Sequence, residues 1–292
     1  MSSIEEKRVY ADSGGKRDVF VATAMGVVVV AVSDDLVGDF GIEHRATAVD
    51  VSAADGRVAV ATAEDVVVTD DEGTAFHALG FGPAVAVGLH DGAVLAADDE
   101  GRVARCAGRA AAIGEPVGEA GDADRDEVDD GERDADWTDL GGVERVRAID
   151  GALIAAADGV HRAGGDGLSR AGLDDVRDVA ASGPGAPLAA TGDGLFSLGN
   201  GWLRELDGRF RAVAADAGGP GAPLAVGDGV YAGSDDGWLA LDYPTDDPVV
   251  DVAIDGGIRY AVTEAGTFLV DAGDGVRSQA LGLHDVAGLA VR

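Results

Sequence analysis

The sequence has 292 residues, of which 46% are hydrophobic and only 5% aromatic, so the chain has enough apolar material for a continuous core. Its formal net charge is −32, because 54 acidic residues face 22 basic ones. Nucleic-acid binding requires clustered basic residues, and here the arginines are scattered among more numerous acids, so this composition excludes nucleic acid as a partner.

The acidic residues are spread along the whole chain, and 41 of the 54 are Asp. Lysine occurs only at Lys7 and Lys16, and the apolar residues are mainly Ala and Val. This composition resembles that of proteins from halophilic archaea. Molar salt shortens the Debye length to about 3 Å and so relieves the repulsion that such a charge creates. We therefore expect a protein adapted to high salt; the alternative is an acidic face matched to a basic ligand.

The first apolar run, Val19 to Val32, follows a polar and acidic N-terminus. The run is too short to span a membrane, and its many valines favour a pair of strands. We expect no membrane partner and a cytoplasmic location. Cys106 is the only cysteine, so no internal disulfide can form, and a lone thiol of this kind is typical of a small core residue.

A repeated unit organises the rest of the chain. An alternating strand begins near residues 45, 84, 144, 177, 211 and 249, and a further one begins near residue 287. In each unit a second apolar strand runs into a glycine turn with a bulky residue after it, and a last strand closes the unit. The steps of about 33–39 residues, with one of about 60, fit four short strands. Helical periodicity is absent, which excludes helical solenoids.

The two ends of the chain complement each other. Residues 286–292 have the pattern of a first strand with nothing after it, and residues 17–44 have that of the remaining strands of a unit. Together they would complete one blade and close a ring. The sequence therefore predicts an all-β fold in one domain over residues 1–292: a seven-bladed β-propeller of four-stranded antiparallel blades. Six or eight blades would follow if one weak unit were misassigned.

Some hairpins resemble the Asp-box of sialidase-type propellers, Ser/Thr-x-Asp-x-Gly-x-Thr-Trp. The segment from Thr69 to Phe76 matches best, and Ser234 to Trp238 and Ser197 to Trp202 match in shortened form. The resemblance implies a structural turn in which the Asp accepts backbone N–H groups and the aromatic residue packs between strands. The whole chain also resembles an uncharacterised β-propeller family of halophilic archaea. Both resemblances imply a fold and no particular activity.

One stretch, residues 114–136, departs from the repeat because it holds 11 acids, two arginines and almost nothing apolar. We expect a disordered acidic insertion between the third and fourth strands of blade three. Asp122, Asp124 and Asp126 have the spacing of a calcium loop, but Glu127 replaces its glycine and Arg133 its bidentate glutamate, so we reject an EF-hand.

Ligand binding is expected where each fourth strand passes into the next first strand, because these loops converge on the central channel. A ring of His, carboxylate and Arg there could orient a polar ligand or a peptide. The alternative is that these residues form turns and salt bridges between blades. The predicted site residues are Glu43, His44, Arg45, Glu144, Arg145, Asp174, Asp175, Arg177, Arg209, Arg211, His284 and Asp285.

No constellation in the sequence specifies catalysis. His44 and His284 with Asp175 or Asp285 could bind a divalent metal, but no histidine spacing supports such a site, and no sialidase residue can be transferred. We expect a monomeric, non-enzymatic scaffold without catalytic residues, metal or cofactor, which binds an unknown protein or a small polar ligand. The alternative is a hydrolase-type enzyme with a metal or an acid–base pair at the channel mouth.

Overall fold

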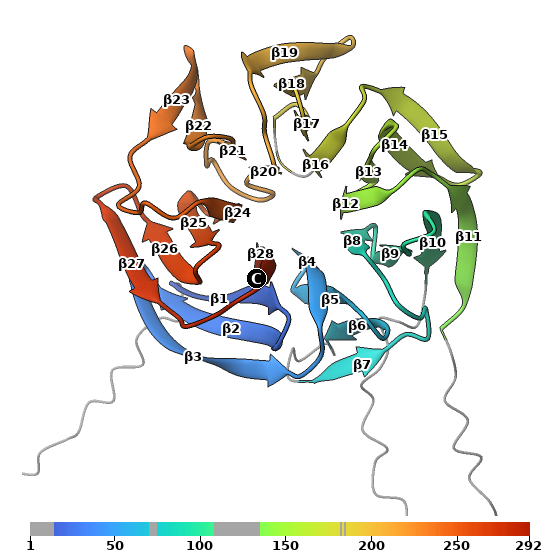
Figure 1. Ribbon diagram of the computed structural model, residues 1–292, viewed down its shortest axis with the longest axis horizontal. Coiled ribbons are helices and arrows are strands. Elements are labelled where there is room, and N and C mark those ends of the chain that lie inside the picture. Colours follow the sequence, from blue (N-terminus) through green and yellow to red (C-terminus); the bar gives the residue numbers. More distant parts are fainter. Residues whose placement is uncertain (1–14, 70–74, 108–134, 182, 184) are drawn as a thin grey trace, which may run out of the picture.

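The computed structural model is a ring of seven four-stranded sheets, and it describes residues 15–69, 75–107, 135–181, 183 and 185–292. All seven sheets are antiparallel, and they are arranged radially around a common centre (Figure 1). The predicted fold class and blade number are confirmed.

Blade 1 is built from both ends of the chain, in the strand order β28-β1-β2-β3. Its strands are β28 (Val286–Val291), β1 (Lys16–Thr23), β2 (Gly26–Ser33) and β3 (Leu36–His44). The inner strand β28 pairs with β1 from Val19↔Val291 to Thr23↔Val286, with one bulge. The predicted closure of the ring is therefore confirmed, and no separate cap is required.

The other six blades follow the chain from the channel outward. Blade 2 comprises β4 (Ala48–Ala54), β5 (Arg57–Thr62), β6 (Val66–Thr69) and β7 (Phe76–Ala78). Blade 3 comprises β8 (Ala86–His90), β9 (Ala93–Ala97), β10 (Arg102–Cys106) and β11 (Trp137–Gly142). Blade 4 comprises β12 (Val146–Asp150), β13 (Leu153–Ala156), β14 (Gly159–Gly164) and β15 (Gly167–Gly172).

Blade 5 comprises β16 (Val176–Ala180), β17 (Leu188–Thr191), β18 (Gly194–Leu198) and β19 (Trp202–Asp207). Blade 6 comprises β20 (Ala212–Ala214), β21 (Leu224–Val226), β22 (Val230–Ser234) and β23 (Gly237–Leu241). Blade 7 comprises β24 (Val249–Asp255), β25 (Ile258–Thr263), β26 (Thr267–Asp271) and β27 (Val276–Ala280).

Among the described residues the core consists of seven apolar clusters, and each one fills the space between two neighbouring blades. Strand alternation produces this arrangement, because successive side chains point to opposite faces of a sheet. On β1, Val19 and Val21 pack toward blade 7, whereas Phe20 and Ala22 pack toward blade 2. Cys106 is buried in the cluster between blades 2 and 3, as predicted.

The acidic stretch predicted at residues 114–136 belongs to the connection between β10 and β11, the third and fourth strands of blade 3. Its predicted disorder concerns residues that lie almost wholly outside the described part of the chain. The same holds for the centre of the Asp-box copy from Thr69 to Phe76. In the copy at Ser234–Trp238, the Ser234 hydroxyl donates to the Gly237 carbonyl at 2.9 Å.

Candidate functional site

Three inner strands carry an aspartate at the same position. Asp50 on β4, Asp178 on β16 and Asp251 on β24 are each the third residue of their strand. Since side chains alternate along a strand, each carboxylate points to the opposite face from the valine that follows it. The three aspartates therefore lie around the channel in blades 2, 5 and 7.

Each of these carboxylates joins two blades. Asp251 accepts the N–H of Val252 at 2.8 Å and that of Leu289, in blade 1, at 2.8 Å. Asp50 bonds Val51 and Val87 in the same way at 2.9 Å each, and Asp178 bonds Val179 and Val213 at 2.8 Å each. Asp150, at the end of β12, adds a bond from the Ala181 N–H at 2.6 Å. We call these four residues the latch aspartates, because each ties its blade to the next one.

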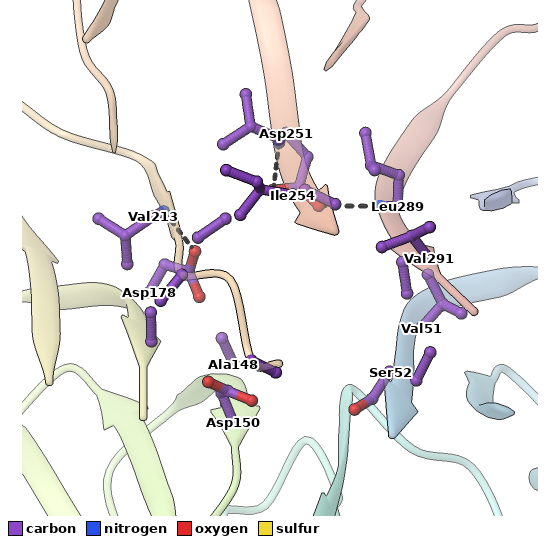
Figure 2. Close-up of a pocket in the computed structure, with 18 of the residues that line it drawn as sticks. Val51, Ser52, Ala148, Asp150, Asp178, Val213, Asp251, Ile254, Leu289 and Val291 are labelled. Atoms are coloured by element: carbon purple, nitrogen blue, oxygen red, sulfur yellow. Dashed lines mark hydrogen bonds between the residues drawn. The ribbon is translucent and has the colours of Figure 1, made fainter. Parts of the chain in front are cut away.

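The latch aspartates line a cavity of about 220 Å³ in the channel. Figure 2 shows Asp150, Asp178 and Asp251 on its wall, with the Val213 and Leu289 bonds as dashed lines. The remaining lining is mainly apolar and comes from six inner strands. It continues to Ala54, Ala180, Ala215 and Asp255, at or just beyond the strand ends. The cavity therefore lies toward the face where first strands turn into second strands, which we call the turn face.

Removal from water shifts the ionisation of these carboxyls. Burial is the largest cause in each case: it raises the pKa of Asp50 to about 7 and that of Asp251 to about 6, and it raises the pKa of Asp178 well above its usual range. The charge of Asp251 adds to the effect on Asp50 and Asp178, and the donated backbone N–H groups oppose it. The channel therefore holds carboxyls that gain protons near neutral pH.

The twelve residues predicted from the sequence lie at the other ends of the inner strands, and none of them lines this cavity. The structure brings a few of them into ion pairs. Asp175 lies 2.7 Å from Arg147 of blade 4 and 3.7 Å from Arg177 of blade 5, and Asp174 lies 2.8 Å from Arg170. The Asp175–Arg147 pair is a salt bridge between blades, as in the alternative that the sequence analysis gives for these loops.

The other predicted residues do not converge on one ligand site. Glu43 lines a groove between blades 1 and 2, where the His44 ring lies 5.2 Å from that of Phe76. Arg211 lines a pocket between blades 6 and 7 and donates to the Val249 carbonyl at 3.4 Å. The remainder are exposed on the surface: Arg45, Glu144, Arg145, Arg209, His284 and Asp285.

Several predicted loop residues hold an unusual backbone conformation. Arg145, Asp175 and Asp285 each directly precede an inner strand and have φ of 49°, 48° and 52°. Side chains other than glycine rarely adopt this left-handed region, although Asp tolerates it better than most residues do. The three residues therefore serve as turn residues at equivalent points of blades 4, 5 and 1.

The latch aspartates were missed by the sequence analysis, although their signal is present in the repeat. An Asp followed by Val recurs near the middle of the first strand at Asp50, Asp178 and Asp251. Within the described ranges, no three His, Cys, Asp or Glu side chains are arranged to hold a metal ion. In the same part of the chain, no helix has the length and apolar character needed to cross a membrane.

The fold and the channel define a β-propeller, and a comparison with family models specifies which kind. Residues 3–292 match the model of the HVO_0234-like β-propeller family, whose designation refers to the halophilic archaeon Haloferax volcanii. The chain belongs to this family. No curated protein matches the chain.

Solved structures share the fold at low sequence identity. Apo AztD from Citrobacter koseri is 12% identical, with a TM-score of 0.52 over 93% of this chain and 82% of AztD. A chain of the nidogen/laminin complex is 9% identical, with a TM-score of 0.56 over 94% and 98%. YCF48 bound to a D1 peptide is 13% identical, with a TM-score of 0.55 over 81% and 83%. At this identity the likeness concerns the fold alone.

Proposed function

We propose that this propeller is a non-enzymatic scaffold that binds a protein partner or a small polar ligand on one face and works in high salt. The observation that carries the proposal is the channel cavity, because six blades contribute their inner strands to it at the turn face. A rigid concave site formed by several elements is the usual location of ligand binding. The proposed face is therefore the turn face, opposite to the loops that the sequence analysis favoured.

The hydrogen bonds of the latch aspartates favour a scaffold over a hydrolase. Asp50, Asp178 and Asp251 each use both carboxylate oxygens as acceptors of backbone N–H groups. A carboxylate whose two oxygens both accept backbone N–H groups stabilises the contact between blades. A general acid or base, in contrast, needs an oxygen that can exchange a proton with the substrate. Two of the similar propellers, the nidogen/laminin chain and YCF48, are described together with a binding partner, which is consistent with a scaffold role.

A pair of charged substitutions on opposite faces tests the proposal. Ala217 is exposed and lines the channel cavity, so Ala217→Arg places a guanidinium at its mouth. Asp174→Arg introduces the same side chain in an exposed loop of the opposite face. Tagged wild-type and variant proteins would be used to capture partners from an extract of halophilic archaeal cells at about 2 M KCl, where charge repulsion is screened.

The expected result is a stoichiometric partner or co-purifying small molecule that Ala217→Arg weakens at least about tenfold, about 1.4 kcal/mol, and that Asp174→Arg retains. Titration calorimetry would measure the affinity for a protein partner, and native mass spectrometry would detect a bound small molecule. Loss of binding in Asp174→Arg alone would assign the binding face to the opposite end of the channel. Recovery of the bait alone, with no bound molecule in its native mass spectrum, would contradict the scaffold proposal.

A further inference from the structure

Arg105 on β10 differs from the other arginines in its surroundings. In the described part of the chain, every other half-buried arginine has a carboxylate or carbonyl partner, as at Arg17–Asp255, Arg259–Asp271 and Arg57–Gly92. Arg105 is half-buried as a residue, and its guanidinium makes neither a hydrogen bond nor an ion pair with any described residue. In a protein with 54 acids, a half-buried arginine without a carboxylate or carbonyl partner is an exception that requires an explanation.

The Arg105 side chain lines a pocket of about 300 Å³ between blades 3 and 4. Arg105 lies opposite Leu95 on the neighbouring strand, and Leu95 packs toward blade 4, so the guanidinium points into the space between the blades. His90 lines the same pocket from the end of β8. Ala163 and Gly164, at the end of β14, and Gly165, in the turn that follows, form the wall on the side of blade 4.

This lining suits a small anion. A guanidinium offers a planar fork of donors that matches two oxygens of a carboxylate or phosphate, and an imidazole N–H can donate to a third. The glycines leave room, because a Cβ added at Gly165 would have no atom within 4 Å. We propose that the pocket between blades 3 and 4 binds a small oxyanion, either free or as the terminal group of a ligand, with Arg105 as its principal contact and His90 as a second donor.

Among the described residues, one carboxylate lines the pocket and opposes this assignment. The side chain of Asp91 lies 3.5 Å from that of His90, but it is 90% exposed and therefore faces solvent. Salt at the concentrations expected for this protein screens an exposed charge much more than a half-buried one. The pocket shares no residue with the channel cavity, so the oxyanion site does not depend on the proposed scaffold function.

The test measures the binding of inorganic phosphate and of acetate to the full chain at constant KCl, by titration calorimetry and by phosphorus-31 NMR for phosphate. Arg105→Gln removes the proposed contact. Arg102→Gln is a matched control, because Arg102 lies on the same strand, with its guanidinium over Phe81, a residue of the cluster on the blade 2 side. We expect saturable binding that weakens at least about tenfold in Arg105→Gln and less than about twofold in Arg102→Gln.

A second pair of variants covers the case in which Arg105→Gln does not fold. Gly165→Glu adds a carboxylate at the rim and is expected to abolish binding, whereas Gly165→Gln, of the same size, is expected to retain it. Tighter binding of phosphate than of acetate would assign the site to phosphate groups, and the reverse to carboxylates. Equal affinity in the Arg105→Gln and Arg102→Gln variants, or no saturation by either anion up to about 50 mM, would overturn the proposal.

Discussion

At the residue scale, the latch aspartates show how a side chain can hold a repeated fold together. The inner strands of neighbouring blades do not pair as one sheet, so their backbone N–H groups need other acceptors. Asp251 supplies one for Leu289, at the junction where the ring closes. A carboxylate has two oxygens and can accept one such bond on each, whereas a serine or threonine hydroxyl has a single oxygen for both.

Asp251→Ala is expected to lower the free energy of unfolding by about 1–3 kcal/mol, because two N–H groups lose their acceptor in a half-buried channel. The measurement is urea denaturation in molar KCl at a pH near 5, where the Asp251 carboxyl is largely protonated in the folded protein, since its pKa is about 6. Asp274→Ala, at an exposed acid of the same blade, is the control and should change stability by less than about 0.5 kcal/mol. Similar values for both variants would contradict the latch role.

The raised pKa of Asp50 predicts a pH dependence. The folded protein retains the Asp50 proton up to a pH of about 7, whereas the unfolded chain releases it near pH 4, so this group stabilises the fold most below pH 4. Its contribution is lost as the pH rises through about 7. Asp50→Asn should therefore show a shallower loss of stability than wild type between these pH values in a denaturation series. Asp274→Asn should keep the wild-type slope; an unchanged slope in Asp50→Asn would refute the prediction.

The sequence analysis identified the strand that carries these aspartates and missed the residues themselves. It placed the site at the loops before the inner strands, where His, Arg and carboxylates gather, as at Glu43–Arg45. The pattern of residue types does not tell which end of the channel is hollow, because that depends on the packing of small residues such as Ala148 and Ala215 across six blades. The burial of Arg105 likewise depends on how blades 3 and 4 pack against each other, which the sequence pattern of one blade does not show.

At the element scale, the outer strands are tied to their neighbours by tryptophan. The Trp202 indole N–H on β19 donates to the Ala171 carbonyl of blade 4 at 3.0 Å, and Trp137 on β11 donates to the Leu79 carbonyl before blade 3 at 2.9 Å. Both rings pack against the cluster between their blade and the preceding one. The third tryptophan, Trp238, also packs against such a cluster.

Trp202→Phe keeps much of the ring packing and removes the bond to Ala171, so we expect a loss of about 1 kcal/mol of stability. The matched control is Trp238→Phe, since Trp238 occupies the corresponding position on β23 and no indole bond to a described residue accompanies its packing. Denaturation in the same buffer should show the larger loss for Trp202→Phe. An equal or smaller loss would mean that ring size, and not the hydrogen bond, determines the contribution.

The blade pattern was predictable from the sequence because short Val- and Ala-rich strands recur at a regular spacing and are separated by turns rich in glycine and aspartate. The closure by β28 was predictable for the same reason, since Val286–Val291 has the pattern of the other first strands. The Asp-box resemblance stays a prediction. Its best copy lies mainly outside the described residues, and short Gly–Asp turns occur in many hairpins.

At the scale of the whole molecule, the charge of −32 governs the conditions in which the ring is stable. Most of the ion pairs between described residues involve Arg and lie at or near the surface, as at Arg170–Asp174 and Arg277–Asp35. Exposed pairs contribute little, and they leave most of the acids without a cation. The repulsion among these acids falls when salt shortens the Debye length.

We therefore expect the melting temperature to rise steeply as KCl is increased from about 0.1 M to 2 M. Scanning calorimetry or circular dichroism would measure it. NaCl at the same ionic strength is the control, because screening of the acidic residues depends on ionic strength and should raise the melting temperature nearly equally in both salts. A melting temperature independent of salt would contradict salt adaptation, and dependence on K⁺ alone would indicate a specific ion site.

The pairing of β28 with β1 also has a consequence for biosynthesis. Blade 1 lacks its inner strand until Val286–Val291 has left the ribosome, and at about 5–20 residues per second the delay is on the order of tens of seconds. During this time the β1 edge that β28 will cover, including Phe20, stays unpaired, and Asp251 has no Leu289 N–H to bind. Final closure of the ring therefore waits for the synthesis of β28, and until then an unpaired edge of β1 is open to intermolecular pairing.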